Sequence, residues 1–144
     1  MRLTILLISN IIDRYIVKKE VISLIVKKAE QYNRIYYTSA FFDEFNKIVH
    51  EKNGKGQYNK WLKRDLLNLD GRGLACLKMK DFEALKETEP KLYCIRYTQS
   101  KKNPRVIFFC KDGEHYYLLH CFLERKTSDY KEAIKTAYER IKFI

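Results

Sequence analysis

The segment KLYCIRYTQSKKNPRVIFFCKDGEHYYLLHCF, residues 91–122, decides the fold, because its aromatic and β-branched residues follow a period of two. Three runs with this period, 91–97, 105–110 and 115–122, are joined by a basic turn and by a KDGE turn. Gly113 of that turn suits the positive φ that a tight hairpin requires. The segment therefore predicts three consecutive antiparallel strands.

Helical spacing of apolar residues replaces this period on both sides of the three strands. A short strand at 34–41, ending at a Thr or Ser cap, leads into a helix at 40–52. The NGKG sequence at 53–56 separates this helix from a second one, which ends at the DGRG sequence at 70–73. A last helix is predicted from residue 128 to the end of the chain. The predicted fold class is α+β, an antiparallel sheet meander with a helical hairpin and a C-terminal helix.

The first part of the chain carries a further helical pattern, with apolar residues from Ile11 to Ala29 and lysines between them. We expect a helix at about 10–31 and two units, an N-terminal helical extension at 1–33 and a main domain at 34–144. The stretch between the hairpin and Pro90 is expected to be irregular, with a short helical turn around KDFEALKE.

The composition points to a basic globular protein of 144 residues, with 29 Lys and Arg against 18 Asp and Glu and a net charge of +11. Such an excess attracts polyanions. The four cysteines form no CxxC pair, which predicts free thiols and no metal site. The apolar start of the chain meets charged residues too soon to span a bilayer. We expect a cytoplasmic protein that does not contact membranes.

The chain resembles the RelE/ParE toxin superfamily, and most closely its HigB-like, phage-derived branch. The resemblance rests on LYCIRY, on RVIFFCKDGEHYYLLHCF with its LLHCF run, and on YKEAIKTAYERI. The superfamily order of a strand, two helices, three antiparallel strands and a C-terminal helix matches residues 34–144. The resemblance implies a RelE-like domain. Glu124 departs from the pattern, because basic residues usually follow the third strand.

The resemblance to members of the RelE and HigB type implies an activity, which is cleavage of mRNA on the ribosome. In this reaction a ribose 2′-OH attacks the adjacent phosphate. This reaction needs a proton acceptor, a proton donor and fixed positive charge for the transition state. It requires no metal, and we expect no cofactor.

The resemblance and the strand order together select the expected catalytic residues. Arg105 matches the strand arginine that stabilises the transition state, and Arg96 should lie beside it across the hairpin, so that both grip one phosphate. His120, expected on one strand face with Leu118 and Phe122, can donate or accept a proton. The remaining expected site residues follow the third strand or lie in the basic turn: Arg125 and Tyr130 as catalytic residues, and Lys101, Lys102 and Lys126 as RNA contacts.

Tyr130 requires a further condition, because an ordinary Tyr with a pKa near 10 is a poor base. It would act as a base only if nearby cations such as Arg125 and Lys126 stabilised its phenolate. A packing role for Tyr130 and a core role for His120 are the structural alternatives.

The resulting prediction is a toxin of a type II toxin-antitoxin pair, a ribosome-dependent mRNA endoribonuclease. Its expected partners are the ribosome, mRNA and an antitoxin that is acidic or carries a helix-turn-helix. One alternative is a ParE-like inhibitor of DNA gyrase that cuts nothing. The other is a non-enzymatic binding protein that keeps the fold.

Overall fold

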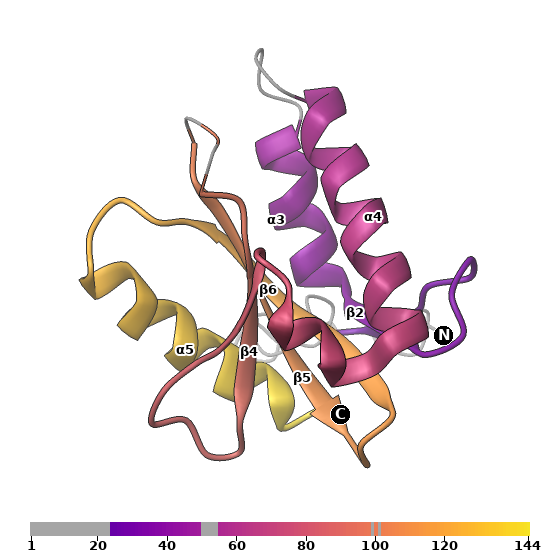
Figure 1. Cartoon of the computed structure of the whole chain (residues 1–144). Helices are drawn as coiled ribbons and strands as arrows, with labels where there is room; N and C mark the ends of the chain where they lie inside the picture. The colour runs from indigo at the N-terminus through magenta and orange to yellow at the C-terminus, as the bar shows by residue number, and fades with distance from the viewer. Residues whose placement is uncertain (1–23, 50–54, 99, 101) are drawn as a thin grey trace, which may run out of the picture.

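The computed structural model describes residues 24–49, 55–98, 100 and 102–144, and it contains the predicted three-stranded meander (Figure 1). Its strands are β4 (Leu92–Arg96), β5 (Pro104–Lys111) and β6 (His115–Leu123), and each pairs antiparallel with the next. Gly113 has a φ of 74° in the turn between β5 and β6, as predicted. The α+β fold class is confirmed.

The meander is part of a six-stranded mixed sheet with the order β1-β2-β6-β5-β4-β3. On one side β2 (Ile35–Thr38) pairs parallel with β6, and β1 (Val26–Lys28) pairs antiparallel with β2. On the other side β3 (Phe82–Ala84) pairs antiparallel with β4. The sheet therefore extends beyond the predicted meander at both edges.

Two predictions about these edges are wrong. The helix predicted at 10–31 is replaced at Val26–Lys28 by β1, because pairing with β2 outweighs a local helical pattern. The rest of that predicted helix, residues 10–23, lies outside the described residues. The stretch expected to be irregular forms η1 (Gly73–Lys78) and then β3, rather than a helical turn around KDFEALKE.

The predicted helical hairpin is confirmed as α3 (Ser39–Val49) and α4 (Lys55–Arg72), which lie side by side over one face of the sheet (Figure 1). The Thr38 hydroxyl caps α3 by accepting a 3.0 Å hydrogen bond from the Phe41 amide. The larger core lies between this hairpin and the sheet and includes Phe45, Leu69 and Phe108.

The C-terminal helix α5 (Ser128–Ile141) covers the opposite face (Figure 1). Ala133 and Ala137 pack there against Cys94, Ile107 and Leu119 in a second, smaller core. These small helix residues let α5 approach the sheet closely.

A bulge in β6 decides which side chains share this second face. The register shifts between Ile107 and Phe108, so that Ile107 pairs with His120 and Phe108 pairs with Leu118. Leu118 therefore lies in the core under α3 and α4, and the expectation that it shares a face with His120 is wrong. The bulge separates the apolar half of β6 from the half that carries His120 and Phe122.

Within the described part of the chain, no helix combines the length and the apolar composition that crossing a bilayer requires.

Candidate functional site

Four of the side chains that the sequence singled out meet on the sheet face covered by α5, here called the α5 face. Arg96 at the end of β4 and Arg105 at the start of β5 are direct cross-strand partners, as predicted. Arg105 also pairs with Phe122 of β6, and His120 lies two residues along from Phe122. Diagonal neighbours of this kind are about 7–8 Å apart. The α5 face thus brings together Arg96, Arg105 and His120, with Tyr130 above them on α5.

Arg105 is the most buried of the cationic side chains on the α5 face, with 5% of its surface exposed. Its Nε and Nη2 atoms both donate to Glu124 Oε1, at 2.9 and 2.6 Å. Its Nη1 is buried and has no hydrogen-bond partner within the described part of the chain. A buried donor left unsatisfied costs about 1–3 kcal/mol, and such groups in a native fold call for an explanation. An anionic ligand would supply the missing acceptor.

Arg96 repeats this arrangement at lower burial. Its Nη1 lies 2.7 Å from Glu83 Oε1 on β3, and its Nε is buried without a hydrogen-bond partner among the described residues. Each guanidinium is therefore held by one carboxylate and keeps one buried nitrogen without an acceptor among the described residues. The two carboxylates also neutralise the charge of the two arginines, which the sequence alone did not predict.

His120 is held by residues from two helices. Its Nδ1 lies 2.9 Å from Glu44 Oε1 on α3, and the Glu44 carboxylate is also gripped by Arg140 of α5. The ring of His120 stacks on Phe122 with centroids 5.5 Å apart and an interplanar angle of 10°. These contacts orient the imidazole, and His120 also lines a small hollow between β6 and α5.

The Glu44 carboxylate stays ionised at this position. Burial alone would raise the pKa of Glu44, but hydrogen bonds from His120 and Arg140 outweigh burial, and the pKa is lowered. Neither Glu44 nor Arg140 was predicted from the sequence as a site residue. Arg140 lies within the matching C-terminal helix, whereas Glu44 carries no local signal, because it meets His120 only through the fold.

Tyr130 lies near the start of α5, where it contacts the α5 face. Its hydroxyl is 3.7 Å from Cys94 Sγ, and its ring packs edge-on against Phe122. Burial and the neighbouring Cys94 raise the pKa of Tyr130 well above its ordinary range. The cation that opposes this shift is Arg105, not Arg125 or Lys126. The structure therefore does not supply the condition for a Tyr130 phenolate, which was stabilisation by Arg125 and Lys126.

Arg125 and Lys126 are exposed in the loop between β6 and α5. Asp129 shapes this loop by accepting hydrogen bonds from both backbone amides, at 2.8 and 3.0 Å. Those bonds lower the pKa of Asp129. Arg125 and Lys102 line one polar hollow of about 480 Å³, and Glu124, which holds Arg105, borders the same hollow. Lys101 lies outside the described residues.

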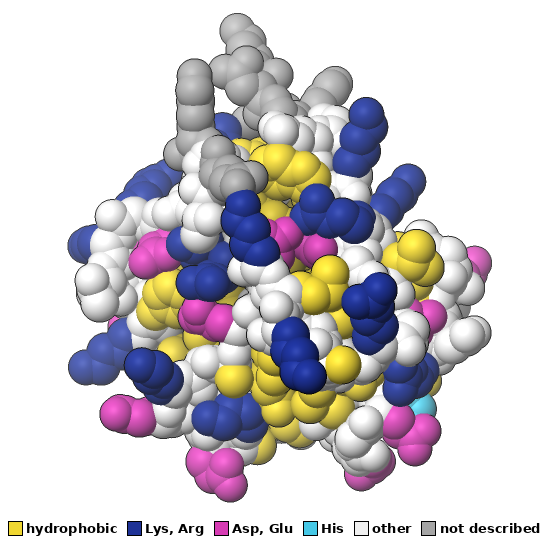
Figure 2. Space-filling model, in the orientation of Figure 1, with side chains coloured by type: hydrophobic (Ala, Val, Ile, Leu, Met, Phe, Trp, Pro, Cys, Tyr) yellow, Lys and Arg dark blue, Asp and Glu magenta, His cyan; other side chains and the backbone are white. Residues whose placement is uncertain are grey.

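The other basic side chains are spread over the surface. In the view of Figure 2, the Lys and Arg side chains of the described residues alternate with apolar patches and with acidic groups, and these described side chains form no single continuous basic patch. The net charge is therefore a general attraction for polyanions, and a specific site must come from local geometry.

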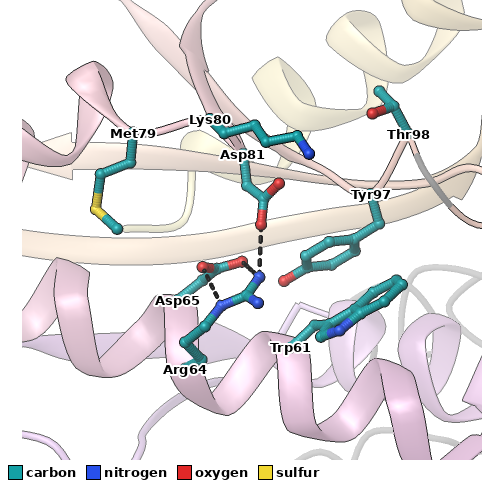
Figure 3. Close-up of a pocket in the computed structure, with 8 residues that line it drawn as sticks. All are labelled: Trp61, Arg64, Asp65, Met79, Lys80, Asp81, Tyr97 and Thr98. Carbon is teal, nitrogen blue, oxygen red and sulfur yellow. Dashed lines mark hydrogen bonds and ion pairs between the residues drawn. The ribbon is translucent and has the colours of Figure 1, made fainter.

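A second polar cavity of about 290 Å³ lies between α4 and the residues that precede β3 and follow β4 (Figure 3). There Arg64 bridges Asp65 and Asp81, with nitrogen–oxygen distances of 3.1 and 2.6 Å. Burial and the charge of Asp65 raise the pKa of Asp81. The Tyr97 hydroxyl is buried beside this group, and burial raises its pKa most. Arg64 pairs with the carboxylates of both Asp65 and Asp81. These ion pairs therefore link α4 to the sheet.

Among the described residues, no group of three or more His, Cys, Asp and Glu side chains is arranged to hold a metal ion. The expected catalytic and RNA-binding roles stay predictions for all the residues that the sequence singled out: Arg96, Arg105, His120, Arg125 and Tyr130, and Lys101, Lys102 and Lys126.

Comparison with known proteins gives one match. A family model described as phage-derived protein Gp49-like (DUF891) matches residues 64–142, which run from α4 through the meander to the end of α5. No curated protein and no solved structure matches the chain.

Proposed function

Because the chain belongs to the Gp49-like family of phage-derived proteins, within the RelE toxin-like group, we propose that it is the toxin of a toxin-antitoxin pair. Its proposed activity is cleavage of mRNA on the ribosome. The observation that carries this proposal is the cross-strand pair Arg96 and Arg105, since each keeps a buried N–H without a partner among the described residues on the face that holds His120.

The proposed reaction uses these groups as follows. His120 takes the proton of a ribose 2′-OH, the 2′ oxygen forms a bond to phosphorus, and the bond from phosphorus to the 5′ oxygen breaks. A solvent water molecule protonates the leaving 5′ oxygen. Arg105 and Arg96 donate to the phosphate oxygens, where charge grows in the transition state. The products are a 2′,3′-cyclic phosphate and a 5′-hydroxyl.

The hollow that Arg125 and Lys102 line offers the RNA backbone a route to this site. Phosphate contacts there would position the strand and carry little sequence information. The phosphate would compete with Glu124 for Arg105, because one carboxylate oxygen now holds two of the guanidinium donors.

The antitoxin would bind a groove on the opposite side of the sheet, between α3, α4 and β1. Its floor includes Phe45 and the half-exposed Phe42, and Lys27, Lys28 and Lys63 line it. An apolar floor with lysines at its rim suits an amphipathic helix with acidic flanks. This surface supports the proposed acidic partner.

Induced expression in a bacterial host tests the proposal. We expect the parent chain to arrest growth, and we expect Arg105→Ala to lower toxicity by two or more orders of magnitude, on the scale of one lost transition-state donor. Arg72→Ala, which removes an exposed arginine of α4, is the matched control and should stay toxic. Circular dichroism must show that Arg105→Ala is folded. A folded Arg105→Ala variant that is as toxic as the parent would contradict the assignment.

One observation favours a second candidate, a non-enzymatic binding protein or a ParE-like gyrase inhibitor. Glu83 and Glu124 neutralise the two arginines that the nuclease needs. Accumulation of relaxed plasmid without mRNA cleavage would support gyrase inhibition.

A further inference from the structure

Glu44 accepts hydrogen bonds from three residues, two of them adjacent in β6 and one in α5. Its Oε1 atom faces His120 Nδ1 at 2.9 Å, the Cys121 amide at 3.1 Å and Arg140 Nη1 at 3.0 Å. Its Oε2 atom accepts from Arg140 Nη2 at 2.8 Å. Three donors therefore converge on one carboxylate oxygen, next to the strand that carries His120.

This convergence decides which nitrogen of His120 carries the proton. An ionised carboxylate only accepts hydrogen bonds, so the 2.9 Å contact with Glu44 requires a proton on Nδ1. Arg140 Nη1 also lies 3.3 Å from Nδ1, but it already donates to Glu44 and to the Leu119 carbonyl. Nδ1 is therefore the donor, and the neutral ring carries its lone pair on Nε2.

The Nε2 edge is available to a ligand. Within the described part of the chain Nε2 makes no hydrogen bond, and His120 lines a hollow of about 190 Å³. Phe122 and Thr136 contribute to its walls, and so do the acidic residues Asp129 and Glu132. The Asp129 carboxylate accepts hydrogen bonds from the Arg125 and Lys126 amides of the loop before α5.

We propose that Glu44 is a positioning residue, which holds His120 in the Nδ1–H tautomer so that Nε2 can accept the 2′-hydroxyl proton of the RNA. Arg140 balances the Glu44 charge and fixes the carboxylate in place. This inference rests on the proposed function, because it names how the same site prepares its base.

Two substitutions separate this role from a simple clamp. Glu44→Gln keeps a carbonyl oxygen where the three donors converge, but it breaks the bidentate pair with Arg140. Glu44→Met has a similar size and removes the acceptor altogether. A clamp that acts only through Arg140 predicts equal loss in both variants, whereas tautomer control predicts that Gln preserves function and Met does not.

Nuclear magnetic resonance of ¹⁵N-histidine-labelled protein at neutral pH reads the tautomer directly. We expect the Nδ1–H form of His120 in the parent and in Glu44→Gln, and a mixture rich in the Nε2–H form in Glu44→Met. Cleavage of translated mRNA should fall by about 10²–10⁴-fold in Glu44→Met, as for a lost general base, and by less than tenfold in Glu44→Gln.

An Nε2–H form in the parent, or an unchanged tautomer in Glu44→Met, would overturn the inference. So would equal loss of cleavage in the two variants. If the parent shows the Nδ1–H form but cleaves no RNA, the proposed function is wrong and the tautomer assignment stands.

Discussion

At the scale of single residues, Glu124 affects how strongly the candidate site can bind an anion, because it pairs with Arg105. The guanidinium is almost fully buried, and two of its nitrogens contact a single carboxylate oxygen of Glu124. Glu124 directly follows β6, and its carboxylate would compete with a phosphate ligand for Arg105. The strength of the site then depends on how easily RNA displaces Glu124.

Replacement of Glu124 by Gln tests this competition. We expect Glu124→Gln to increase toxicity at a given level of inducer, because the neutral amide holds Arg105 less strongly than a carboxylate does. We also expect the free energy of unfolding to fall by about 1–3 kcal/mol, the cost of weakening a bond to a buried charge. Growth curves over graded inducer, together with urea unfolding, measure both effects. A stable Glu124→Gln protein with reduced toxicity would show that Glu124 supports the site.

At the scale of the elements, Glu44 joins α3, β6 and α5 through ionic contacts that depend on pH. The pKa of Glu44 lies below its ordinary value of 4.5 in the fold, so its contribution to stability is complete above that value. The contribution is lost as pH falls through the lowered pKa. Glu44→Gln removes this contribution at every pH.

The expected result is a difference between parent and Glu44→Gln that is largest near neutral pH and shrinks below pH 4.5. Urea unfolding at a series of pH values measures it. A constant difference across the acid range would mean that the Glu44 carboxylate does not favour the folded state electrostatically.

Gly73 connects α4 to η1 in a conformation that few other residues adopt. Its φ is +61°, and a Cβ added there would lie 2.7 Å from the Tyr116 hydroxyl oxygen. We expect Gly73→Ala to lower the free energy of unfolding by about 1–3 kcal/mol. Gly71→Ala is the matched control, because a Cβ there meets nothing within 4 Å. Urea unfolding of both variants checks this, and equal stability would contradict the steric account.

The elements differ in how well the sequence predicted them, for physical reasons. β4, β5 and β6 were predictable because each has a period-two pattern and a short turn that fixes its neighbour. β1 and β3 have only three residues each, and pairing at the sheet edges creates them. The bulge in β6 escaped prediction because no glycine or proline marks it.

The candidate site was likewise predictable from the sequence only in part. The adjacency of Arg96 and Arg105 followed from the hairpin, since local register sets it. The partners of these residues could not be read from the chain: Glu44 and His120 are 76 residues apart, and Glu44 and Arg140 are 96 apart. The raised pKa of Tyr130 was also hidden, because it depends on burial against Cys94 and Phe122.

At the scale of the whole molecule, the two faces of the sheet support different tasks. The α5 face carries the arginine pair and His120, while the face under α3 and α4 carries the apolar groove with its lysines. This division would let an antitoxin bind without occupying the site directly. The net charge of +11 would draw the protein to ribosomal RNA, with or without the antitoxin bound.

Primer extension on mRNA translated in a reconstituted system, with purified protein, tests the central claim most directly. The account predicts cleavage within codons on ribosomes, a 2′,3′-cyclic phosphate at the new end, and loss of both with folded Arg105→Ala but not with Arg72→Ala. Intact mRNA in the presence of the folded parent protein would contradict it.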